Sequence, residues 1–277
     1  MGMRINTNVA SINGQRNLRM TNLDMRKAME RLSSGSRINH AGDDAAGLAI
    51  SENLKAQIRG FNMNMRNAED GISLVQVAEG GLNETGNILV RLRELAIQAA
   101  SDTLGPTERG FLDVEYQNLL KEIGRIAEAT EFNKTKLLNG SGQLFEFQVG
   151  IRNKDGVDRI AFNSARANAT LKGLGLEELN VSDKIIAQTS LAKVDDAITR
   201  VSSARADFGA LQNRLQSTIE NLGVSVENLS AAKSRVLDAD MATESAEFTR
   251  NNIMLQSGVS VLAQANQVNS MALKLLS

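Results

Sequence analysis

The sequence lacks the side chains on which most enzyme sites and metal sites depend. It contains no cysteine, no tryptophan and a single histidine, His40, among 277 residues. Without cysteine there can be no disulfide, no thiol nucleophile and no Cys/His zinc cluster. We therefore expect no catalytic residue, no metal site and no cofactor.

Proline, aromatic residues and net charge are also scarce. The one proline, Pro106, leaves long stretches free to form helices, and aromatic residues make up only 3% of a chain that is 42% hydrophobic. Lys and Arg number 31 against 32 Asp and Glu, so charge favours neither nucleic acid nor an anionic membrane. No apolar run reaches the roughly 18 residues of a membrane span, and none follows Met1 as in a Sec signal. We expect no nucleic-acid partner and no membrane insertion.

Three short stretches resemble functional sites, but for each one an interpretation without catalysis or ligand binding is favoured. His40 stands alone in a polar loop, which favours a solvated side chain. Asp43 and Asp44 precede a predicted helix, so helix capping is favoured over acid–base catalysis. Gly42 to Gly47 has the spacing of a phosphate loop, but Leu48-Ala49 stands where Lys and Ser or Thr are required.

Apolar residues recur at alternating steps of four and three, which is typical of coiled-coil helices. A helix from Asp43 to Ala100 would be about 85 Å long at 1.5 Å per residue. Pro106 and the N-cap candidate Thr107 introduce a third helix, and the helical period resumes near Ile185 and continues almost to the C-terminus. The seam of the long helix is Leu54, Ile58, Phe61, Met65, Ala68, Ile72, Val75, Glu79, Leu82, Gly86, Leu89, Arg93 and Ala96.

The period changes to two only between Asn133 and Asn163. Phe145, Phe147 and Val149 alternate with polar residues, and a turn at 153–156 leads to a second strand at 157–162, which predicts a β-hairpin. The stretch from Lys172 to Ser182 is expected to be irregular. The sequence thus predicts a mainly α chain: a long antiparallel helical coiled-coil bundle, or rod, with a small β-hairpin in the middle of the chain.

The helices expected at the two ends of the chain have seams that polar residues dilute. The N-terminal seam of Ile5, Val9 and Ile12 continues into Arg16 and Arg19. The C-terminal seam is Phe248, Asn252, Leu255, Val259, Leu262, Asn266, Asn269, Leu273 and Leu276. Such helices are weak alone, and Asn at a seam fixes register or partner number at a cost in stability. We predict that the two ends pair with each other and with copies of the same chain.

Several strings of residues resemble the bacterial flagellin family. They are RINTN at 4–8, RLSSG at 31–35, GDDAAGLAI at 42–50 and FNKTKLLNG at 132–140, then QNRL at 212–215, DADMA at 238–242 and LAQANQ at 262–267. Lys134 stands where the family often has Gly, and Val268-Asn269 stands where it often has Pro-Gln. The large outer domains of many flagellins have no counterpart here, so the chain resembles a minimal flagellin.

The resemblance implies a structural subunit that polymerises into the helical filament of the bacterial flagellum. It also implies export without a Sec signal by the flagellar export machinery and a chaperone, an extracellular location, and contacts with hook-junction and cap proteins. The segments expected on this basis are a filament-core helix and loop (1–42), the first part of the coiled coil with the hairpin (43–170), an irregular connection (171–184), the second part of the coiled coil (185–242) and a second filament-core helix (243–277). The residues expected to drive self-assembly are Ile5, Val9, Ile12, Leu255, Val259, Leu262, Leu273 and Leu276.

Two further interpretations concern partners other than the chain itself. By similarity to the family, Arg91, Leu95 and Glu115 would form a surface recognised by an innate immune Toll-like receptor, although the same stretch is also ordinary for a coiled coil with exposed charges. The alternative to a filament subunit is a related hook–filament junction protein or a non-polymerising coiled-coil binding module. Formation of long filaments by the chain alone distinguishes the two.

Overall fold

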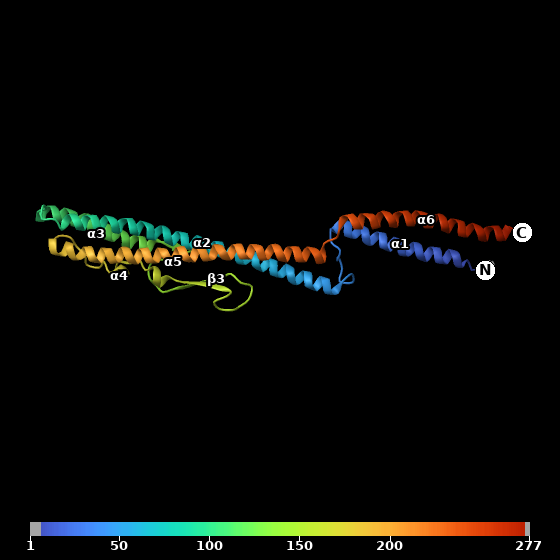
Figure 1. Cartoon of the computed structure of the whole chain (residues 1–277), viewed down its shortest axis with the longest axis horizontal. Coiled ribbons are helices and arrows are strands. Elements are labelled where there is room, and N and C mark those ends of the chain that lie inside the picture. The colour runs from blue at the N-terminus through green and yellow to red at the C-terminus, as the bar shows by residue number, and fades with distance from the viewer. Residues whose placement is uncertain (1–6, 275–277) are drawn as a thin grey trace. The chain divides into compact units, whose positions relative to one another are not determined.

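The computed structural model describes residues 7–274, with side chains as far as Gln267, and consists mainly of long helices (Figure 1). The helices are α1 (Val9–Ser34), α2 (Ala45–Ala99), α3 (Pro106–Ala129), the short α4 (Leu171–Leu174), α5 (Lys184–Leu237) and α6 (Met241–Lys274), with a 3-10 turn at Ser164–Ala167. The strands are β1 (Glu131–Phe132), β2 (Thr135–Lys136), β3 (Leu144–Gln148) and β4 (Arg159–Asn163). The prediction of a mainly α fold with a small hairpin in the middle is confirmed.

The chain divides into two compact units. The central unit is 57–227, and the terminal unit combines 1–56 with 228–277. Helices α2 and α5 contribute residues to both units. The five segments expected from the sequence describe layers of a filament and stay a prediction, because these units reflect contacts within one molecule.

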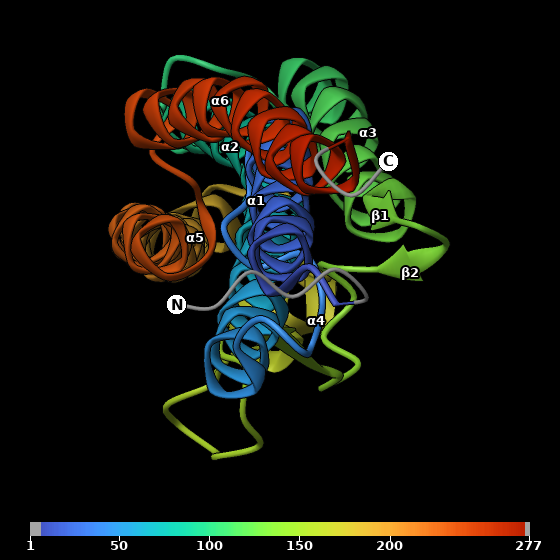
Figure 2. The same cartoon turned by 90° about the vertical axis from the view of Figure 1, so that its right-hand side faces the viewer.

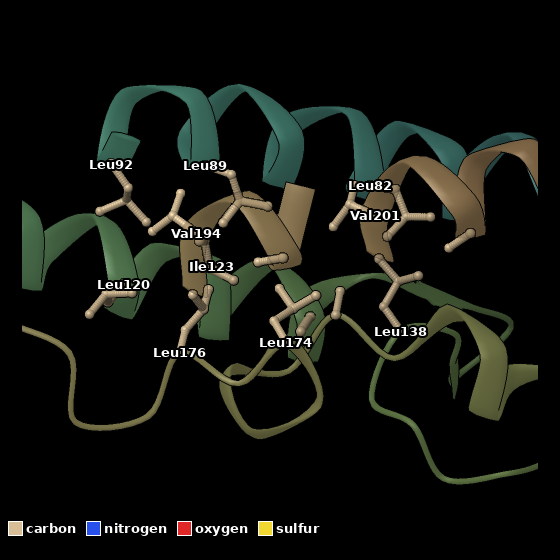
Figure 3. Close-up of a cluster of buried hydrophobic side chains, with 14 of the residues drawn as sticks. Leu82, Leu89, Leu92, Leu120, Ile123, Leu138, Leu174, Leu176, Val194 and Val201 are labelled. Atoms are coloured by element: carbon tan, nitrogen blue, oxygen red, sulfur yellow. The ribbon is translucent and has the colours of Figure 1, made fainter. Parts of the chain in front are cut away.

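The central unit is held by helices α2, α3 and α5, with α3 and α5 each antiparallel to α2, and their buried apolar side chains meet in one core. The Arg93 Nε donates to Asp195 Oδ1 at 2.7 Å between α2 and α5, and the Arg91 Nε donates to Glu115 Oε1 at 2.9 Å between α2 and α3. Figure 3 shows leucine, isoleucine and valine side chains from all three helices pointing toward one another. Each fully buried leucine stabilises the unit by about 1.5–3 kcal/mol. This core needs no partner chain.

The seam of α2 follows two series of buried positions, each repeating every seven residues. One series is Ala68, Val75, Leu82, Leu89 and Ala96, and the other is Asn64, Gly71, Ala78, Thr85, Leu92 and Ala99. The first series agrees with the predicted seam. The second lies one residue before the predicted Met65, Ile72, Glu79, Gly86 and Arg93, so this half of the prediction was wrong.

The second series was predicted one residue too late because most of its members are small. The second series is mostly small, and Gly71 allows the Phe147 ring to lie so close that an added Cβ would be 3.0 Å from its Cδ1. Glu79 and Arg93 remain at the surface, where they pair with Arg205 and Asp195. A search for large apolar residues cannot find a seam in which small residues receive side chains from other elements.

The predicted hairpin is confirmed as strands β3 and β4. Phe145 lies opposite Phe162 and Phe147 opposite Ile160 in an antiparallel register. The Phe162 ring lies 4.8 Å, centre to centre, from the ring of Phe208 on α5. This aromatic contact adds to apolar burial and fixes the hairpin on the helices.

Two local features differ from the sequence-based expectation. The strands β1 and β2 form a second, very short hairpin through a turn at Asn133 and Lys134, whose φ angles are 48° and 64°. This left-handed backbone favours glycine, yet the chain has Asn133 and Lys134 here. Helix α3 begins at Pro106 itself with Gly105 as N-cap, not after Thr107.

The stretch expected to be irregular is part of the core. Its buried residues are Leu174, Leu176, Leu179 and Val181. The Gln117 Nε2 of α3 donates to the Leu179 carbonyl at 2.7 Å, and the Val181 N–H donates to Asp113 Oδ1 at 2.8 Å. These side chains hold the segment against α3.

Two adjacent glycines of α2 provide a test of this packing. We expect Gly80→Ala to raise the free energy of unfolding by about 0.5–1 kcal/mol, because alanine favours the helix and the added Cβ meets no atom within 4 Å. Gly81→Ala should lower it, because the Cβ would lie 2.6 Å from Thr130 Oγ1 and 2.8 Å from Leu138 Cδ1. Urea unfolding followed by circular dichroism measures both. Equal effects of the two variants would contradict the close approach at Gly81.

Candidate self-association surface

The terminal unit contains an antiparallel pair of helices, α1 and α6, which lie side by side (Figures 1 and 2). Near one end the Asn8 Nδ2 donates to the Ala265 carbonyl at 3.0 Å, and near the other end the Arg31 Nη1 donates to Glu244 Oε1 at 3.0 Å. Helix α1 ends as predicted at Gly35, whose φ is 69° and whose N–H donates to the Arg31 carbonyl. The predicted pairing of the two ends within one chain is therefore observed for the described residues.

The seam between these helices depends on glycines that receive leucines. A Cβ added to Gly258 would lie 2.6 Å from Leu18 Cδ2, and one added to Gly14 would lie 3.2 Å from Leu262 Cδ1. Leu18 thus packs over Gly258, and Leu262 packs over Gly14. Among the described side chains of the two helices, the buried ones are Ser11, Ala28 and Asn251. Small and polar residues at a seam bury little apolar surface, so the pair is weak.

The loop before α2 carries capping groups rather than a catalytic site. Asp44 Oδ1 accepts from the Gly47 N–H at 2.9 Å, and Asp43 Oδ2 accepts from the His40 N–H at 3.1 Å. Backbone N–H donors, that of His40 first, hold the pKa of the Asp43 carboxyl below its usual range. The His40 ring is largely exposed, with Nε2 2.8 Å from Glu30 Oε1. These contacts stabilise the loop.

The sides of α1 and α6 that face away from the seam expose many large apolar side chains. We call them the outer apolar surface. On α1 they are Val9, Ile12, Met20 and Leu23, exposed by 56–64%, and on α6 they are Ile253, Met254, Val259 and Val261, exposed by 45–59%. Scattered apolar residues are ordinary at a surface, and eight on one helix pair make these helices a candidate interaction surface.

Helix α6 most clearly combines exposed apolar residues with a lack of charged residues. Residues 251–273 contain no Asp, Glu, Lys or Arg, and exposed apolar residues lie on both flanks of the described part of the helix as well as opposite its seam. Uncharged polar residues, Asn, Gln and Ser, lie between these apolar side chains, and in the described part of the helix α1 covers only one side. A groove of about 460 Å³ runs between the helices, lined by Leu18, Arg19, Asn22, Leu23, Arg26, Leu255 and Val259.

The structure divides the predicted self-assembly residues into two groups. Val9, Ile12 and Val259 belong to the outer apolar surface, whereas Leu255 and Leu262 are half-buried against α1. Ile5 and Leu276 lie outside the described residues, as does the side chain of Leu273. The sequence analysis missed Met20, Leu23, Ile253, Met254 and Val261. Met20 and Leu23 continue the stripe of Val9 and Ile12 one turn beyond Arg16, which is the signal that was overlooked.

The three residues predicted for receptor contact are not equivalent. Arg91 and Glu115 are about half exposed and form an ion pair of 2.9 Å that also includes Glu94. Leu95 is completely buried in the central core. A partner of the folded chain can reach Arg91 and Glu115 but not the Leu95 side chain, so Leu95 was the wrong choice for a direct contact.

Long packed helices define a class, that of mainly helical proteins whose helices pack in a bundle. Within the described residues there is no group of three or more His, Cys, Asp or Glu side chains placed to hold a metal ion. No helix in that part of the chain has the length and apolar character needed to cross a membrane.

Known proteins identify the family within this class. Residues 5–143 match the model of the bacterial flagellin N-terminal helical region, and residues 191–276 match that of the C-terminal helical region. The chain is 44% identical to a flagellin of Halalkalibacterium halodurans and 42% identical to a flagellar filament core protein of Treponema phagedenis, in each case over 99% of this chain and 100% of the relative. The crystal structure of Bacillus cereus flagellin, 33% identical, matches 61% of this chain and 94% of its own with a TM-score of 0.51.

The chain therefore belongs to the bacterial flagellin family. It is a structural subunit of the flagellar filament, which lies outside the cell. The identity over the full chain supports a filament subunit, and no comparison favours the alternative of a junction protein or a non-polymerising module.

The weak seam of the terminal pair predicts a difference in amide hydrogen exchange. In the monomer, amides of α1 and of residues 241–267 in α6 should exchange at least about 100-fold faster than those of α2 between 72 and 99, because less apolar burial opposes local opening. Mass spectrometry of exchanged peptides measures both. Terminal helices as protected as α2, in a sample verified to be monomeric, would contradict a weak seam.

Proposed function

We propose that the chain polymerises by covering its outer apolar surface with the terminal helices of other copies. The observation that carries the proposal is α6, which is uncharged from 251 to 273 and is covered on one side only. Fully burying one Val, Ile, Leu or Met side chain contributes about 1.5–3 kcal/mol, and eight such side chains are available on each chain. That gain is large enough to offset the entropy lost when a subunit is immobilised.

The outer apolar surface also favours an open assembly over a closed one. It extends over several sides of the pair, so one chain can contact more than one neighbour at the same time. Contacts between different faces of identical subunits give rings or open helices, depending on whether the rotation closes. Open helical growth is the arrangement that a filament requires.

Each predicted assembly residue has a separate role in this proposal. Val9, Ile12 and Val259 contact neighbouring chains directly, while Leu255 and Leu262 hold α6 against α1 so that the surface has a defined shape. Ile5, Leu273 and Leu276 extend the contact beyond these residues. Because the pair is weak alone, docking on a neighbour completes its ordering, and assembly is thereby coupled to folding.

The family resemblance supports further partners. We propose that the flagellar export machinery and an export chaperone handle the chain before assembly, and that hook-junction and cap proteins contact it at the ends of the filament. We also propose that a Toll-like receptor can recognise the monomer through Arg91 and Glu115, since both side chains are accessible and already oriented by their ion pair.

Exchanging Val9 and Ile12 for serine tests the assembly surface. We expect the double variant to keep the melting temperature of the wild type, because both side chains are more than half exposed, and to lose polymerisation. The matched control is Leu89→Ala in the central core, which should cost about 2–5 kcal/mol of stability and still form filaments below its melting temperature. Circular dichroism measures melting, and sedimentation with electron microscopy measures filaments formed by salting out. Normal polymerisation of the double variant would contradict the proposal.

The loop between β3 and β4 provides a second test. An epitope tag inserted after Asp155 should be tolerated and should bind antibody along the whole filament, because Asp155 is highly exposed and exposed polar loops accept insertions. The same tag inserted after Leu262 should prevent filament formation by interrupting the seam with α1. A filament that accepts the second insertion and rejects the first would reverse the roles assigned to the two regions.

A further inference from the structure

The exposed sulfur of the described chain is concentrated on the terminal helix pair. The sequence has ten methionines and no cysteine, so methionine is its only oxidisable sulfur. Five of the described methionine side chains are about half exposed. Four of them lie on α1 and α6, namely Met20, Met29, Met241 and Met254, and the fifth, Met63, lies on α2 in the central unit.

Two of these four methionines are part of the outer apolar surface. Met20 lies on the same stripe of α1 as Val9 and Ile12, and Met254 lies on a flank of α6 close to Val261 along the helix. Met29 and Met241 are near the other end of the pair, close in sequence to the Arg31–Glu244 contact. All four residues are about half exposed in a single chain and would be covered in a polymer that buries this pair.

We propose that these four methionines are sites of reversible oxidation by peroxide, and that their oxidation prevents the subunit from joining a filament. The proposal rests on the assembly surface proposed above. It adds a chemical modification that decides whether that surface is able to associate.

The chemistry requires only the thioether and the oxidant. The methionine sulfur attacks one oxygen of hydrogen peroxide, the O–O bond breaks, and an S–O bond forms. The sulfur loses two electrons and becomes a sulfoxide, and the remaining oxygen leaves as water. Methionine sulfoxide reductases can return the sulfoxide to the thioether.

A sulfoxide conflicts with burial of this surface. Oxidation converts a flexible apolar side chain into a polar one. Around Met254 there is no charged side chain between 251 and 273 to pair with the new oxygen, and a buried polar group without a partner costs enough for this sulfoxide alone to raise the critical concentration for polymerisation by about tenfold. Met20, Met29 and Met241 have charged residues close by in the sequence, so their sulfoxides oppose assembly mainly through the loss of apolar surface. The core of the central unit does not depend on these sulfurs, so the oxidised chain should stay folded.

The experiment compares three proteins before and after treatment with hydrogen peroxide. They are the wild type, a variant in which Met20, Met29, Met241 and Met254 are all leucine, and the control variant Met63→Leu. Leucine conserves volume and apolar character and cannot form a sulfoxide. Each monomer is treated, freed of peroxide, checked for sulfoxide positions by mass spectrometry and for folding by circular dichroism, and then polymerised by salting out.

We expect the critical concentration of the wild type and of Met63→Leu to rise at least about tenfold after oxidation, and that of the four-leucine variant to change little. Treating the oxidised wild type with methionine sulfoxide reductases should restore polymerisation. Methionines of the preformed filament should be oxidised more slowly than those of the monomer.

Three results would overturn the proposal. The first is normal polymerisation of wild type that carries sulfoxide at all four positions. The second is an equal loss of polymerisation in the four-leucine variant. The third is failure of the reductases to restore assembly after the sulfoxides have been removed. If untreated wild type does not polymerise, the assembly surface itself is refuted, which is a different outcome from a failure of oxidation control.

Discussion

The uncovered sides of α6 are the constraint on which the rest of the molecule depends. Helix α6 has no charged residue from 251 to 273, and its described part has exposed apolar side chains on both flanks. Helix α1 alone does not cover these side chains. In the proposed assembly this surface is covered by other copies, while the central unit folds around a core of its own. The two units use different kinds of packing.

The central unit has large buried side chains and needs no partner. Leucines from α2, α3 and the segment around Leu176, together with valine, alanine and Phe208 from α5, form a buried core. The terminal pair instead has glycines, serine and asparagine along its seam, with leucines placed over Gly14 and Gly258. This seam specifies the register of the two helices accurately while contributing little stability. A weak but specific pair suits a surface whose final ordering comes from its neighbours.

Much of the fold could be predicted because helical periodicity is a local property. The long helices, the Gly35 terminus of α1 and the β3–β4 hairpin all follow from residue spacing and turn chemistry. The prediction failed where small residues form the contact, as at Gly71 and Ala78 in α2, since these carry no hydrophobic signal of their own. It also missed β1 and β2, which are too short to show a period of two.

The sequence by itself determined the class of the protein, its family resemblance and the weakness of its two ends, because these depend on composition, motifs and the polar residues of each seam. Only the tertiary structure decided which apolar residues remain uncovered. Val259 and Leu262 are one helical turn apart, yet Leu262 packs over Gly14 and Val259 faces outward. Periodicity gives a stripe on a helix, but the position of the partner helix decides which edge of the stripe is buried.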